Sequence, residues 1–245
     1  MKNLNAVKRL TIVLYVFVFI IFVAGCSNSF KNLTPKDAVI KANERMKQTK
    51  GYRMKIETML NVKDIRQKVI FEGEVQNPGI VHLKGDLMGM ELEIYQKDDA
   101  FFIKNPFTGK WTESRDIGIA EVDNIIKTPG ETFDDLNELI VEAEYLPDEK
   151  LGDIDCKVVR YVPDREKIAK IINGKSSNEI KYKQYTFKAW IGKKDFLIHK
   201  MNVDIVLYAG KIGEQTINMT ISYFDFNAKD IDVQLPPELL PQAKN

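Results

Sequence analysis

Apolar and polar residues alternate along most of this chain, and the alternation limits the fold more than any other feature of the sequence. Between Met54 and Leu60 every second residue is apolar or threonine. Runs with the same period follow as far as residue 103, separated by turn sequences such as Asn77-Pro78-Gly79. Because the side chains of a strand point alternately to its two faces, each run predicts a strand with one apolar and one polar face. We therefore expect residues 52–113 to form an antiparallel meander.

The second half of the chain shows the same period. Strands are expected at residues 157–162, 180–191, 197–208 and 214–226. Together with the meander they predict a large, mostly antiparallel sheet of eight or more strands, in which helices are insertions.

Helices are predicted at three places. Residues 35–50 begin with Thr34, a good N-cap, and Pro35, which suits the first helical position. Residues 133–143 place apolar side chains at helical spacing, and residues 164–172 form a short segment that Gly174 ends.

The amino terminus has the layout of a signal peptide. Three basic residues precede an apolar run, and 16 residues separate Arg9 from Cys26. The end of this run, Val23-Ala24-Gly25-Cys26, resembles the bacterial lipobox, which implies cleavage between Gly25 and Cys26 and lipidation of Cys26. Residues 1–25 are then the signal peptide, residues 26–33 a lipidated tether and residues 34–245 the folded domain. The alternative is an uncleaved signal anchor in which Cys26 is incidental.

The net charge and the cysteine content argue against a nucleic-acid-binding protein and against a fold held by disulfides. Without residues 1–25 the chain has 33 basic and 35 acidic side chains, a net charge of about −2. Nucleic-acid binding depends on clustered positive charge, so nucleic acid is not an expected partner. Once Cys26 is lipidated only Cys156 remains, so no disulfide is expected, and Cys156 is predicted to be a small buried residue on a strand.

The sequence offers little catalytic chemistry. His82 and His199 lie 117 residues apart in strand-like runs, without further ligands at metal spacing. We therefore expect no enzyme activity, no catalytic residues, no metal and no cofactor. The strands also contribute more apolar side chains to one face of the sheet than three short helices can cover. The sheet is therefore expected to curl and leave a cleft, unless side chains fill its interior.

The order of elements resembles the lipoprotein-carrier superfamily that includes LolA and the LppX-type lipoproteins. The resemblance covers most of residues 34–237. Its most specific parts are Ala189-Trp190-Ile191-Gly192, where the family often has Asp at the last position, and the segment from Tyr223 to Asn227. It implies an α+β fold, a strongly curved antiparallel sheet or incomplete β-barrel with helices packed in its concave mouth, whose concave face binds acyl chains.

The resemblance leads to one functional hypothesis and one alternative. The first is a lipid-anchored lipoprotein at the outer face of a Gram-positive-type cytoplasmic membrane, which binds or carries lipid or lipidated molecules. The alternative is an extracytoplasmic sensor or regulator that binds a protein partner, such as an envelope-stress factor or a cell-wall enzyme. The parity of the alternation selects the candidate cleft residues, which are Ile56, Leu60, Phe71, Leu83, Leu92, Ile94, Met201, Val203, Ile205, Met219 and Ile221.

Overall fold

The fold is dominated by one antiparallel β-sheet. A computed structural model describes residues 30–63, 65–87, 89–97, 100–113, 137–167, 180–210 and 213–240. The part of the chain from Leu33 onward forms one compact unit, and the short 3-10 helix η1 (Phe30–Asn32) belongs to the unit before it.

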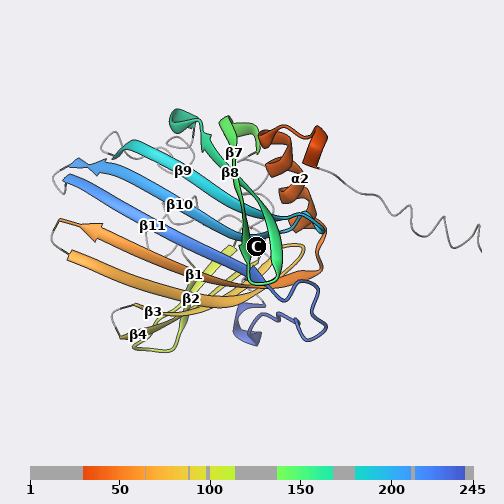
Figure 1. Ribbon diagram of the computed structural model, residues 1–245. Coiled ribbons are helices and arrows are strands. Elements are labelled where there is room, and N and C mark those ends of the chain that lie inside the picture. The colour runs from red at the N-terminus through yellow and green to blue at the C-terminus, as the bar shows by residue number, and fades with distance from the viewer. Residues whose placement is uncertain are drawn as a thin grey trace, which may run out of the picture. The chain divides into compact units, whose positions relative to one another are not determined.

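Eleven strands of the described chain form a single sheet (Figure 1). Their order is β6-β5-β4-β3-β2-β1-β11-β10-β9-β8-β7, so the first and last strands of the chain are neighbours at the centre. Each strand is antiparallel to its neighbours, which confirms the predicted meander and the mostly antiparallel β-sheet. The strands are β1 (Gly51–Val62), β2 (Ile65–Gln76), β3 (Ile80–Leu87), β4 (Met90–Lys97), β5 (Ala100–Lys104), β6 (Trp111–Glu113), β7 (Ile140–Leu151), β8 (Ile154–Pro163), β9 (Ile180–Gly192), β10 (Ile198–Ala209) and β11 (Gly213–Phe224).

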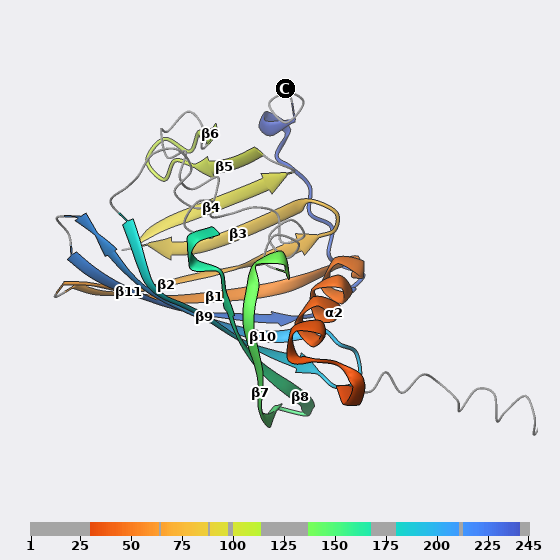
Figure 2. The ribbon, with the colours of Figure 1, turned by 90° about the horizontal axis from the view of Figure 1, so that it is seen from above.

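The helix α2 (Pro35–Gln48) lies beside the half of the sheet formed by β7–β10 (Figure 2). It begins as predicted, because Thr34 Oγ1 accepts a hydrogen bond from the Asp37 N–H at 3.1 Å. Its buried face carries Ala38, Val39, Ala42, Asn43 and Met46.

Cross-strand register separates the side chains into two faces. Phe71, Ile56, Ile221 and Met201 lie directly opposite one another in four successive strands, β2, β1, β11 and β10. Directly opposed residues of antiparallel strands share a face, so these residues define one side of the sheet, which we call the apolar face. The other side, the charged face, includes Arg53 and carries cross-strand ion pairs such as Lys55–Glu72.

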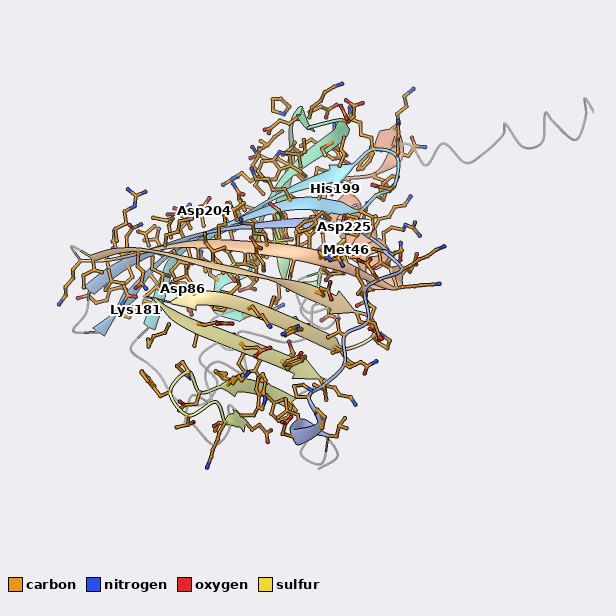
Figure 3. The ribbon with its side chains drawn as sticks, turned by 90° about the horizontal axis from the view of Figure 1, so that it is seen from below. Met46, Asp86, Lys181, His199, Asp204 and Asp225 are labelled. Atoms are coloured by element: carbon orange, nitrogen blue, oxygen red, sulfur yellow. The ribbon has the colours of Figure 1, made fainter. Side chains whose placement is uncertain are left out.

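The carboxyl-terminal segment, residues 225–240, is tied to the charged face. The Arg53 guanidinium is bonded to Asp225 and Asp230 at 3.0 and 2.8 Å, and to Glu74 on β2 at 2.8 Å. Beyond this ion-pair group, Val233, Leu235 and Leu239 pack against Tyr95 and Phe102. The segment ends in a 3-10 helix, η4 (Pro237–Leu239). Figure 3 shows Asp225 at the same end of the sheet as His199, with Lys181 at the opposite end.

Glu93 is the centre of a second ion-pair group on the charged face. Its carboxylate is bonded to His82 Nε2 at 3.0 Å and Lys104 Nζ at 2.9 Å, with Lys84 Nζ at 3.4 Å. Burial alone raises the pKa of Glu93, but the bonds from Lys104 and His82 and the charge of Lys84 outweigh it and lower the pKa to about 2. The folded state therefore favours the ionised carboxylate.

We expect Glu93→Gln to lower the free energy of unfolding at pH 7 by about 1–3 kcal/mol, because it removes charge-assisted bonds at a largely buried site. The folded pKa lies below the ordinary value of 4.5, so this contribution is complete above about pH 4.5 and is lost as the pH falls toward about 2. Urea unfolding of both proteins across this range measures the difference. Glu91→Gln, at an exposed position on the same strand, is the control, and a Glu93 effect no larger than that of Glu91 would contradict the assignment.

Two sequence predictions concern strands β7 and β8, and only the first of them is confirmed. Cys156 is fully buried on β8, as predicted, and burial raises the pKa of its thiol to about 11. The helix predicted over residues 133–143 is wrong from Ile140 onward, where the chain is strand β7. Register shifts between Ile140 and Glu142 and between Leu146 and Glu149 interrupt the alternation in β7, so its period-two pattern is absent from the sequence. The first part of that predicted helix, residues 133–136, and most of the predicted helix at 164–172 lie outside the described residues.

Candidate ligand-binding face

All eleven cleft residues predicted from the sequence lie on the apolar face. Register places them in four parallel rows, each crossing several strands. The rows are Leu92, Phe71, Ile56, Ile221 and Met201; Leu83 and Ile94; Val203 and Met219; and Leu60 and Ile205. The structure therefore brings these residues together on one surface.

Exposure differs across this surface. Met201 and Val203 on β10 are only 3% and 5% exposed, and Leu83 and Ile94 on β3 and β4 are also buried. The other seven candidates are partly exposed, and five of them lie on the central strands β1 and β11 or on β2 beside them. Most of the partly exposed candidates thus lie on the central strands, where they alternate with buried residues of the same face such as Met54 and Val69.

The row of Ile56 is shaped by a glycine. Gly85 on β3 lies opposite Phe71, and a Cβ atom at Gly85 would lie 2.4 Å from both the Phe71 ring and the Ile70 carbonyl oxygen. Any side chain here would displace the ring or the backbone, so the glycine leaves the room that the Phe71 ring occupies beside β3.

Four tyrosines with raised pKa values, Tyr52, Tyr161, Tyr185 and Tyr223, lie on the same face and were not among the predicted site residues. Tyr52 and Tyr223 contact edge to face with ring centroids 5.6 Å apart, and Tyr161 stacks on Phe187 at 4.9 Å. The ring of Tyr185 also contacts Phe187, with ring centroids 5.0 Å apart. Their period-two positions mark them as members of this face, but sequence alone gave no reason to separate them from core residues.

Burial sets the chemistry of these tyrosines. It raises the pKa values of Tyr52, Tyr161, Tyr185 and Tyr223, so all four carry neutral hydroxyl groups at physiological pH. The hydroxyl of Tyr161 on β8 lies 3.9 Å from the sulfur of Met201 on β10, so the Tyr161 side chain extends across the intervening strand β9. The tyrosines therefore add neutral hydroxyl groups to a surface that is mainly apolar.

The two histidines are held by carboxylates in separate places. His82 stacks on Tyr95 on the charged face, with ring centroids 4.1 Å apart. His199 lies at a register shift of β10 and is bonded to Asp195 at 3.0 Å. Burial raises the pKa of Asp195, but the bonds from His199 and the Leu197 N–H lower it overall. A Cβ atom at Gly192 would lie 2.2 Å from Asp195 Oδ1, so this carboxylate takes the space that a side chain at position 192 would need.

Gly25 and Cys26 lie outside the described residues. No group of three or more His, Cys, Asp or Glu side chains within the described ranges is placed to hold a metal ion. The helices in that same part of the chain are too short or too polar to cross a membrane.

Comparison with known proteins finds likeness in structure only. No family model and no curated protein matches the chain. The lipoprotein LppX of Mycobacterium tuberculosis matches 82% of this chain and 97% of its own, at 10% identity and a TM-score of 0.49. LprF of Mycobacterium bovis matches 83% of this chain and 96% of its own, at 11% identity and a TM-score of 0.49. A LolA superfamily protein of Nitrosomonas europaea matches 84% and 97%, at 12% identity and a TM-score of 0.35. Both groups that the sequence resembles are thus present among similar solved structures.

Proposed function

We propose that this chain is an extracytoplasmic lipoprotein that binds or carries lipid, or lipidated molecules, on the apolar face. The observation that carries the proposal is the partial exposure of Phe71, Ile56 and Ile221, side by side on β2, β1 and β11. The centre of a sheet whose face is filled by its own side chains is its most buried part. A continuous apolar surface that stays accessible there is typical of a ligand-binding site.

The proposal includes the shape expected from the sequence. A wide sheet that curves about its apolar face as an incomplete barrel would surround an acyl chain and leave one side open for entry. The Tyr145 hydroxyl, on the apolar face of β7, donates to the Leu33 carbonyl oxygen just before α2, so the helix lies toward this face. In this proposal α2 closes the β7–β10 side of the site, and the partly exposed central strands receive the ligand.

Apolar contact alone is sufficient for such a function. Burial of one methylene contributes about 0.8 kcal/mol, so a chain of about 14 carbons contributes up to roughly 10 kcal/mol before ordering costs. No bond is made or broken, and the proposed protein acts without catalysis.

The proposed cellular location of this function follows from the amino-terminal sequence. The lipobox-like sequence ending at Cys26 would give a two-chain lipid anchor, which holds a protein stably at a membrane surface. We propose that residues 26–33 tether the domain to the outer face of the cytoplasmic membrane, where acylated molecules are concentrated.

Lipid that purifies with the protein tests the proposal. Residues 27–245 are produced without the signal peptide, purified without detergent and extracted with organic solvent for mass spectrometry. We expect about one acyl-bearing molecule per chain. Protein that is folded but free of lipid would overturn the proposal, and the stable presence of one partner protein in such a sample would favour the regulatory alternative.

A further inference from the structure

Five long strands meet at the end of the sheet that lies away from α2 (Figure 1). Here β1 turns into β2, β10 turns into β11, and β9 begins. Register places Val62 opposite Gln215, and Tyr208 opposite both Glu214 and Lys181, so the three segments are neighbours. We call this surface the hairpin end, and its described members are residues 61–63, 65–68, 181–184, 207–208 and 214–215.

The hairpin end is basic, although the chain without residues 1–25 has a net charge of about −2. Its described members include five basic side chains and one acidic side chain, Glu214. Asp64 and Lys211, in the two turns, lie outside the described residues and have opposite charges. Two of the five basic side chains, Lys68 and Lys183, form ion pairs with glutamates. The other three are exposed and form no ion pair within the described part of the chain, and they are Lys63, Arg66 and Lys181.

Two large apolar side chains are exposed beside these cations. Ile65 is 64% exposed and precedes Arg66 at the start of β2. Tyr208 is 44% exposed and lies directly opposite Lys181. A single exposed apolar residue is common, but apolar side chains at hairpin tips among unpaired cations are the combination by which a protein binds a membrane surface. Cations attract anionic headgroups, an aliphatic side chain enters the acyl region, and tyrosine favours the interface between them.

The arrangement favours a bilayer over an acidic protein as the partner. A protein interface is centred on a continuous apolar patch with a polar rim. At the hairpin end the two exposed apolar side chains belong to separate hairpins, with strands β1 and β11 between them, and basic residues adjoin each of them. Separate tips of this kind suit insertion between lipid headgroups.

We propose that the hairpin end binds the surface of a bilayer that contains anionic phospholipid. Lys63, Arg66 and Lys181 lie against the headgroup phosphates, and Ile65 enters the acyl region. Val62, directly opposite Ile65, continues the apolar face to this end, so the bound bilayer lies against one edge of that face. The inference goes beyond the proposed function, because it concerns a different surface and holds whether or not the apolar face takes up lipid.

Vesicle binding tests the inference. Residues 27–245, which contain the whole compact unit and lack the lipid anchor, are mixed with vesicles and sedimented. One set of vesicles is phosphatidylcholine alone, and the other is an equimolar mixture of phosphatidylcholine and phosphatidylglycerol. Each basic residue at an anionic surface strengthens binding about fivefold, so three unpaired cations predict about 100-fold tighter binding to the mixed vesicles. Added salt is expected to weaken this binding.

The triple variant Lys63→Gln/Arg66→Gln/Lys181→Gln is expected to lose most of this preference, again about 100-fold in affinity for the mixed vesicles. The matched control removes three exposed lysines at the opposite end of the domain, where α2 ends and β1 begins, and is Lys47→Gln/Lys50→Gln/Lys229→Gln. It has the same change in net charge, and we expect it to lower the affinity by less than about fivefold. Thermal unfolding checks that both variants remain folded.

Ile65→Ser tests insertion separately from charge. We expect it to lower the affinity for the mixed vesicles about tenfold, the contribution of one isoleucine side chain transferred from water to an apolar layer. Ile154→Ser is the control of the same residue type. Ile154 is 37% exposed at the turn between β7 and β8, two residues from Cys156, which pairs with the last residue of β9 at the opposite end of that strand. This control should bind as the unchanged protein does.

The outcomes separate the two proposals. Equal binding to both kinds of vesicle, equal losses in the triple variant and its control, or unchanged affinity of folded Ile65→Ser would overturn the inference and leave the proposed function in place. A folded protein that ignores anionic vesicles but binds an acidic protein would overturn it as well. Lipid that purifies with the protein tests the proposed function, so a lipid-free protein that binds anionic vesicles through the hairpin end would support the inference and overturn that function.

Discussion

Met219→Lys is expected to lower the amount of bound lipid by at least about 100-fold, because an ammonium group on the apolar face must be desolvated against the ligand. Met219 is partly exposed on the central strand β11, opposite Thr58 and Val203. The long lysine side chain can reach solvent when the face is empty, so we expect the protein to fold with a smaller loss of stability. Quantitative mass spectrometry of lipid that purifies with the protein measures the effect.

Asn218→Lys is the matched control, because position 218 adjoins Met219 on the same strand and lies on the charged face. Asn218 Nδ2 already donates to Asp204 Oδ1 at 2.7 Å, so a lysine there has a carboxylate within reach. The control should retain its lipid. Equal lipid content in the two folded variants would show that the apolar face is not the binding surface.

Phe102→Ala is expected to lower the free energy of unfolding by about 3–5 kcal/mol, the usual cost of removing a buried phenylalanine. Phe102 is fully buried on β5, where Tyr95, Leu235 and Leu239 surround it. The substitution leaves a cavity between the sheet and the carboxyl-terminal segment, both of which contribute side chains to the cluster around Phe102.

The neighbouring hairpin offers a control of the same residue type. Phe107, in the loop between β5 and β6, is 83% exposed, so Phe107→Ala is expected to change stability by less than about 0.5 kcal/mol. Urea unfolding of both variants gives the comparison. A loss below about 1 kcal/mol for Phe102→Ala would show that the carboxyl-terminal segment does not form a tightly packed cluster with β4 and β5.

Period-two patterning was sufficient to predict the central strands and the face to which their side chains point. Ile56, Phe71 and Met201 were grouped from parity alone, and the register places them in one row although 145 residues separate the first from the last. Parity works here because the long hairpins of the central sheet keep a regular register over most of their length.

The same reasoning failed where the register is irregular. The two shifts in β7 move residues out of step with β8, so Ile140 and Ala143 acquire a helical spacing by coincidence. Strand pairing along β8 determines the conformation of this segment, and such pairing is a tertiary property that a local pattern does not contain.

The polar part of the candidate site was also beyond the sequence. Tyr161 and Tyr223 fit an apolar strand face equally well as ordinary core residues. Only three-dimensional contacts, such as the reach of the Tyr161 hydroxyl across β9 to the sulfur of Met201, show which other strands these side chains approach. Sequence alone identifies the face, and geometry identifies its chemistry.

The central seam between β1 and β11 also sets the order in which the protein can be built. Arg53 pairs with Phe224, the largest sequence separation in the sheet, whereas β1–β6 and β7–β10 are formed from strands that follow one another closely in the chain. Contacts between near neighbours form fastest, so each half is expected to form before the seam, which closes last. The surface that carries Ile56 and Ile221 is therefore complete only once β11 has paired with β1.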